Sequence, residues 1–82
     1  MIDDLNLAVA TCKQFNETEI VVSQRLFFEI VDKVTASGQG HIRVNVPNQS
    51  EKYRYKHTVL WQSITFMTLS QELVGVAHSS AG

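Results

Sequence analysis

The 82-residue chain has one cysteine, one proline and no long run of apolar residues. Its single cysteine, Cys12, cannot form an internal disulfide, and secreted domains this short usually need disulfides, so we expect a reducing, cytoplasmic location. The start Met1-Ile2-Asp3-Asp4 lacks the basic residues of a signal peptide. No apolar run approaches the roughly 18 residues of a membrane span. The sequence therefore predicts a soluble protein with no membrane partner.

Charged residues are also few, at 18% of the chain, while 44% of the residues are apolar. The apolar fraction is too high for a disordered chain, and the low charge leaves uncharged surface that favours a partner protein or a homo-oligomer. Residues 1–40 hold six acidic and three basic side chains, whereas residues 41–82 hold two acidic and four basic ones. The two halves either bind partners of opposite charge or attract each other within the fold.

The length allows one hydrophobic core, so we expect a single domain over residues 1–78 followed by a frayed tail at 79–82. The clearest helix covers residues 17–36. Asn16 is placed as its N-cap, Glu19 completes a capping box, and Ser37-Gly38 ends it. Its main apolar arc consists of Ile20, Leu26, Phe27, Ile30, Val31 and Val34.

The remaining segments predict a second helix and a sheet. Residues 2–14 fit a helix or a strand, and their alanines and early acidic residues favour the helix. Residues 42–46 alternate like a strand that ends at Pro47, and the run 52–69 needs a turn or bulge near Gln62-Ser63, where its apolar parity changes. Residues 72–77 predict a last strand. We therefore expect an α+β fold with two N-terminal helices followed by a three- or four-stranded antiparallel sheet, the long helix packed across one face.

Catalytic and metal-binding patterns are missing from the sequence. The candidate soft or imidazole ligands are Cys12, His41, His57 and His78, and no two have the close spacing of a structural zinc site. Acidic pairs stand only at predicted helix starts, where the helix dipole explains them. No glycine-framed serine is present. We expect no enzyme activity, no cofactor and no metal.

Several aromatic, apolar and basic side chains are candidates for binding a partner. Val21 and Phe28, seven residues apart, form a second ridge beside the main helical arc. On a strand, Tyr53, Tyr55 and His57 would point one way and the cations of the same run the other, as on an edge strand whose rings rest on the helix. Either Trp61 or Leu60 must face outward. The candidate set is Val21, Phe28, Tyr53, Arg54, Tyr55, Lys56 and Trp61, with Val59 and Trp61 as one outward pair.

Two functions fit these observations. The first is a small non-enzymatic protein-binding module, an adaptor or an inhibitor of a larger protein machine, of the plain kind that phages use to modulate host defences. The second is a nucleic-acid-binding module that uses the basic and aromatic strands 41–57, with a homodimer doubling a weak basic face. The net charge of −1 and pI near 6.2 favour the first.

Overall fold

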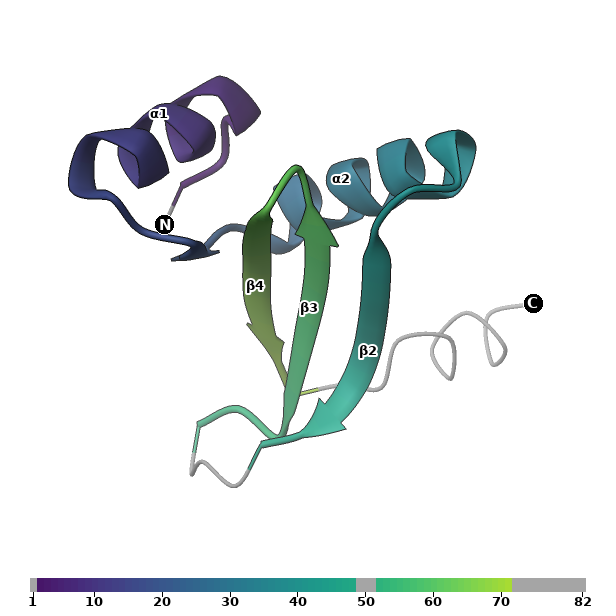
Figure 1. Cartoon of the computed structure of the whole chain (residues 1–82). Coiled ribbons are helices and arrows are strands. Elements are labelled where there is room, and N and C mark those ends of the chain that lie inside the picture. Colours follow the sequence, from purple (N-terminus) through teal and green to yellow (C-terminus); the bar gives the residue numbers. More distant parts are fainter. Residues whose placement is uncertain (1, 49–51, 72–82) are drawn as a thin grey trace.

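The computed structural model of the chain describes residues 2–48 and 52–71. Within them the elements follow the order α1 (Leu5–Phe15), β1 (Glu19–Val21), α2 (Gln24–Ser37), β2 (His41–Pro47), β3 (Tyr55–Trp61) and β4 (Ile64–Ser70). The strands form one sheet in the order β1-β4-β3-β2 (Figure 1). β3 is antiparallel to both neighbours, and β1 is parallel to β4. The predicted α+β class is confirmed, with one parallel strand pair added.

Helix α2 packs its apolar arc against one face of the sheet, as the sequence predicted. The buried core combines Leu26, Phe27, Ile30 and Val34 of α2 with Val22, Val59, Ile64 and Phe66 of the sheet region and with Ala8 and Cys12 of α1. Residues 2–14 thus form a helix over most of their length, and the Cys12 thiol is buried in the core. Burial raises the pKa of this thiol, which keeps it protonated and unreactive.

The predicted start of the long helix is wrong. Asn16 is not its N-cap but the left-handed C-cap of α1, with φ 53°. Helix α2 begins at Gln24, where the hydroxyl of Ser23 accepts a hydrogen bond from the Leu26 N–H at 3.1 Å. Its end is as predicted, because Gly38 caps it in the left-handed region with φ 71°. The segment between the two helices is the short strand β1.

Strand β1 forms because its residues pair with the interior strand β4. Ile20 lies beside Phe66, and Val21 beside Met67. A β-branched residue fits this pleated position well, so tertiary pairing overrides the capping pattern that favoured a helix. The predicted ridge of Val21 and Phe28 on one helix is therefore wrong, since Val21 belongs to β1 and Phe28 to α2.

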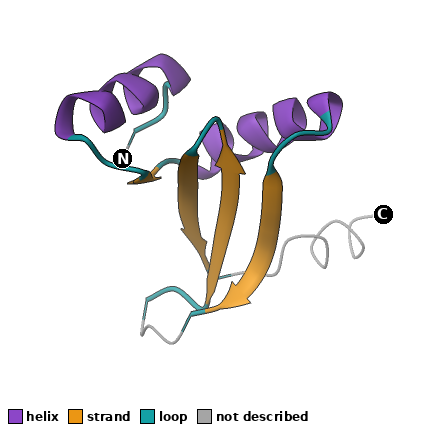
Figure 2. Cartoon of the chain, in the orientation of Figure 1, coloured by secondary structure: helices purple, strands orange, loops and turns teal. Residues whose placement is uncertain are grey.

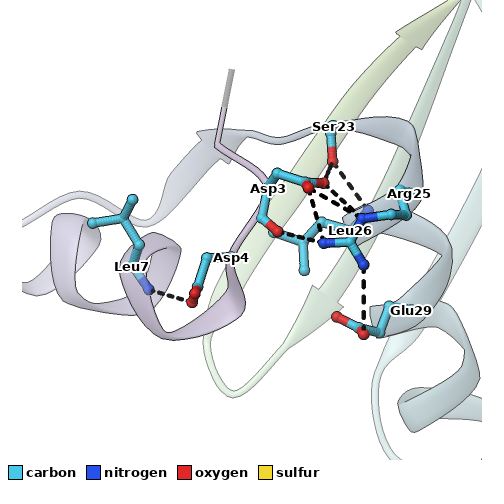
Figure 3. Close-up of polar contacts among 7 residues, drawn as sticks. All are labelled: Asp3, Asp4, Leu7, Ser23, Arg25, Leu26 and Glu29. Carbon is cyan, nitrogen blue, oxygen red and sulfur yellow. Dashed lines mark hydrogen bonds and ion pairs between the residues drawn. The ribbon is translucent and has the colours of Figure 1, made fainter.

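A polar cluster fixes the segment before α1 against the start of α2 (Figure 3). The Asp3 carboxylate accepts a hydrogen bond from the Ser23 hydroxyl and pairs with Arg25, whose Nη2 lies 2.9 Å from Asp3 Oδ2. The same Nη2 donates to the Asp3 carbonyl at 2.6 Å. Hydrogen bonds from Arg25, and then from Ser23, lower the pKa of Asp3. Next to it, Asp4 caps α1 by accepting the Leu7 N–H at 3.1 Å. Both carboxylates thus have structural roles.

The β3–β4 hairpin turns at Gln62-Ser63, where the sequence predicted a turn or bulge. Both residues have positive φ, 51° and 67°, which is the conformation of a type I′ turn. The turn lets Val59 and Ile64 face the same core in spite of the change in sequence parity. The predicted strand at 72–77 and the tail at 79–82 lie outside the described residues.

A β-bulge interrupts β2 at Val44 and Asn45. Arg43 pairs with Thr58 and Val46 with Lys56, so these two residues oppose the single residue His57. The extra residue takes a positive φ of 59° at Asn45. Ile42 and Val46 consequently lie on opposite faces, which the plain alternation of the sequence does not predict.

Candidate functional site

The two faces of the sheet differ in what covers them. Helix α2 and the core lie on one side, where Val59 and Phe66 are fully buried. On the other side no described helix lies over β3 and β4, and Figure 2 shows the sheet from this side with α2 behind it. We call this side the open face.

The strand register gives the residues of the open face. Strand partners point to the same side of a sheet, and neighbours along a strand point to opposite sides. Leu60, next to the buried Val59, therefore marks the outward row. The open face consists of three rows: Glu19, Thr65, Leu60 and His41; Val21, Met67, Thr58 and Arg43; and Leu69, Lys56 and Val46.

Most of the open face is apolar or weakly polar. Leu60 is 43% exposed and Val21 44%. The side chains of Met67, Leu69 and Val46 are half-buried among their neighbours. Threonines occupy the positions between them. The face thus presents exposed and half-buried apolar side chains with threonines between them.

Charges on the open face lie mostly at its edges. Glu19 is on edge strand β1, whereas His41 and Arg43 are on edge strand β2, and all three are exposed. Lys56 lies on β3 at the end of the face near Val46. The face contains no aromatic ring among its three rows, because Tyr55, His57 and Trp61 alternate to the core side of β3.

Of the seven predicted binding residues, two lie on the open face, Val21 and Lys56. Tyr55 is half-buried on the core side of β3, and Tyr53 is half-buried in the loop before it. The Lys52 ammonium lies 5.6 Å from the Tyr53 ring centroid. Arg54 is exposed in the same loop, between the half-buried Tyr53 and Tyr55. The structure does not bring this set together.

Phe28 and Trp61 serve the core rather than an outward patch. The Phe28 ring lies 5.1 Å from that of Phe27 in an edge-on arrangement. Trp61 is half-buried and packs against the core, and Val59 is fully buried, so the predicted outward pair of these two residues is wrong. Leu60 is the outward residue instead. The expected edge strand is also wrong, since β3 is an interior strand.

Trp61 separates two shallow grooves at the hairpin end of the sheet. One groove of about 340 Å³ runs between this ring and α1, where Val9 and Lys13 line it. The other, of about 490 Å³, runs toward the loop after α2, with Gly40 and Leu60 in its lining. Neither is lined by a carboxylate or an imidazole.

A third groove of about 420 Å³ lies between the start of α1 and α2, and it is charged. Its lining includes Asp3, Arg25 and Glu29. Arg25 bonds to Asp3 and lies 3.9 Å from Glu29, so these charges largely neutralise one another. The interaction with Asp3 raises the pKa of Arg25. We interpret these charges as structural, because they hold the segment before α1 against the start of α2.

His57 is a fully buried polar residue on the core side of β3. Its Nδ1 accepts a hydrogen bond from the backbone N–H of Asn45 at 2.9 Å, which explains how the bulge is held. Nε2 of His57 and Oγ1 of the neighbouring Thr68 have no hydrogen-bond partner among the described residues. Burial lowers the pKa of His57. The ring contacts Phe27 and Phe28, with centroids 5.8 and 6.2 Å away. Such a ring is neutral and structural.

The open-face residues that the sequence did not single out for binding include Leu60, Met67, Leu69, Glu19 and Arg43. One signal was available, because the change of parity at Gln62-Ser63 left Leu60 as one of two outward alternatives. The others needed the register, since they come from three strands, β1, β2 and β4, that are distant in sequence.

The described residues show no metal site and no membrane-spanning helix. Within residues 2–48 and 52–71, no three His, Cys, Asp or Glu side chains gather in a way that could hold a metal ion. Neither described helix is long and apolar enough to span a bilayer. Comparisons with protein-family models, with curated proteins and with solved structures found no match to the chain. The open face is thus the feature from which a function can be argued.

Proposed function

We propose that this chain is a small non-enzymatic protein-binding module whose open face packs against a partner protein, as an adaptor or an inhibitor does. One observation carries the proposal: Leu60 and Val21 are more than two-fifths exposed on a face whose other side is packed against the core. Exposed apolar surface of this kind, bordered by charges, is typical of a protein contact.

The partner meets the face rather than the free edge of β2. Edge strands attract other strands through their unpaired backbone groups unless a bulge, a proline or a charge prevents it. β2 has all three, because Asn45 lies in the bulge, Pro47 ends the strand and Arg43 is charged. A strand added at this edge could pair regularly with three residues at most, His41 to Arg43, before the bulge.

A nucleic-acid partner fits this geometry less well. Single strands bind where aromatic rings stack on bases beside cations that contact phosphates. Here Tyr55 and His57 point to the core side of β3, whereas Arg43 and Lys56 point to the open face. Rings and cations are therefore on opposite sides of the sheet.

Two leucine substitutions test the proposal. Leu60→Lys places a charge in the centre of the open face, and Leu7→Lys places the same charge on α1 at a similarly exposed leucine, 54% against 43%. We expect the unaltered protein and Leu7→Lys to recover the same protein from an extract of the producing cell, and Leu60→Lys to lose it. Equal recovery by both variants, or no recovery by any of the three, would contradict binding of a different protein through the open face.

A further inference from the structure

We infer that the protein that covers the open face is a second copy of this chain, packed face to face about a two-fold axis parallel to the strands. The inference rests on the proposed function, because it uses the same face as a protein-binding surface. It goes further by naming the partner and its orientation.

The open face has opposite charges on its two edge strands. Glu19 on β1 and His41 on β2 lie at the two ends of one row, and Arg43 follows His41 in the next row. Neither Glu19 nor Arg43 forms an ion pair with any residue in the described part of the chain. Each copy thus has an acidic edge and a basic edge that are not neutralised from within.

Only one of the two simple face-to-face arrangements joins these edges. A two-fold axis parallel to the strands exchanges the edges of the sheet, so β1 of one copy lies over β2 of the other. Glu19 then lies opposite His41 of the second copy and diagonally across from its Arg43 in the next row, and symmetry forms the contact twice. An axis across the strands would instead place Arg43 over Arg43, and such like-charge contacts disfavour an interface. The charge pattern selects the first axis.

The same rotation gives acceptable contacts between the interior strands. It places β4 of one copy over β3 of the other, about 10 Å apart as in packed sheets. Each larger apolar side chain then meets a threonine or the flexible stem of a cation, whose charged end can reach water. The opposed pairs are Leu60 with Thr65, Met67 with Thr58, Leu69 with Lys56, and Val21 with Arg43.

The size of the face indicates a weak, reversible dimer. Four strands about 4.8 Å apart, with three outward rows, give a face of roughly 400 Å² in each copy. Two such faces bury roughly 800 Å², about two-thirds of the lower limit of roughly 1,200 Å² for stable complexes. We expect a dissociation constant on the order of 100 µM. The edge charges mainly set the orientation, since exposed ion pairs contribute little affinity.

Charge reversals measured by sedimentation equilibrium, from about 10 µM to about 1 mM protein, test the orientation. We expect Glu19→Arg and Arg43→Glu each to weaken self-association at least about tenfold. The double variant should recover it, because both contacts are then present with their signs exchanged. Asp32→Arg, which makes the same charge change on an exposed position of α2, should leave it unaltered. Unaltered association of Glu19→Arg would overturn the proposed axis.

Thiol labelling of Leu60→Cys identifies what covers the face. The natural thiol, Cys12, is buried and reacts slowly. If a second copy covers the face, labelling of the cysteine at position 60 slows as the protein concentration rises. Rapid labelling at every concentration overturns the dimer. The proposed function is then still tested by the extract experiment with Leu60→Lys. Slow labelling at every concentration means that the chain covers its own face, which overturns the dimer and the proposed function together.

Discussion

The close approach of α2 to the sheet depends on Gly40, and its replacement gives the sharpest test of the packing. Gly40 has φ 124°, and a Cβ there would lie 2.6 Å from the backbone oxygen of Leu60 and 2.9 Å from Val34 Cγ1. Gly38, two residues earlier, has φ 71° and nothing within 4 Å of the same position. Both glycines have a positive φ that strains a substitution, and only at Gly40 would a Cβ also overlap other atoms.

We expect Gly38→Ala to lower the free energy of unfolding by about 1 kcal/mol, the usual cost of a left-handed alanine. Gly40→Ala adds the displacement of a backbone oxygen and should cost about 3–5 kcal/mol. A domain of this length has roughly 4–12 kcal/mol in total. With a urea slope near 1 kcal/mol per molar, the midpoints should fall by about 1 M and about 3 M or more. Equal midpoints for the two variants would refute the close packing of Gly40 against β3.

The other predictions concern the bulge and the hairpin. Burial lowers the pKa of His57. In the unfolded chain this imidazole is protonated as the pH falls through about 6.5, whereas in the folded chain it stays neutral to a lower pH. The free energy of unfolding should therefore fall as the pH is lowered from 7 to 5. The slope is at most about 1.4 kcal/mol per pH unit, and it applies between the unfolded-state and folded-state pKa of His57. In urea titrations at several pH values, His57→Asn should abolish this slope, whereas His41→Gln, at an exposed position, should retain it. A slope that persists in His57→Asn would show that another group causes it. Ser63→Gly relieves a positive φ of 67° and should raise the thermal midpoint by about 4–8 °C. Ser63→Ala, which keeps the Cβ, should give no such rise, and a similar rise would exclude turn strain as the cause.

The elements with strong local signals could be predicted from the sequence. The α2 arc ends at Gly38 because a glycine adopts the left-handed cap without cost, and the turn at Gln62-Ser63 followed from a change of apolar parity. Strand β1 could not be predicted in this way. The spacing of Asn16 and Glu19 matched a capping box, and only pairing with β4, more than forty residues later, makes residues 19–21 a strand.

The proposed binding surface was harder to predict than the fold. Its rows combine residues from four strands, and their order depends on a parallel pairing that the sequence does not show. The bulge at Asn45 also moves Val46 to the open face, while Val44 before it is 41% exposed outside the three rows. The run from Tyr53 to His57 predicted a binding site because rings that stack on bases alternate there with cations that bind phosphates. In the fold most of these rings help to enclose the core.

The central claim about the partner, that the open face of the sheet binds a second copy of this chain, is tested most directly by amide chemical shifts recorded at rising protein concentration. We predict that the concentration-dependent shifts gather at Val21, Leu60 and Met67 and at the edge residues Glu19 and Arg43. Shifts confined to α1, or the absence of any concentration dependence up to about 1 mM, would contradict association through this face.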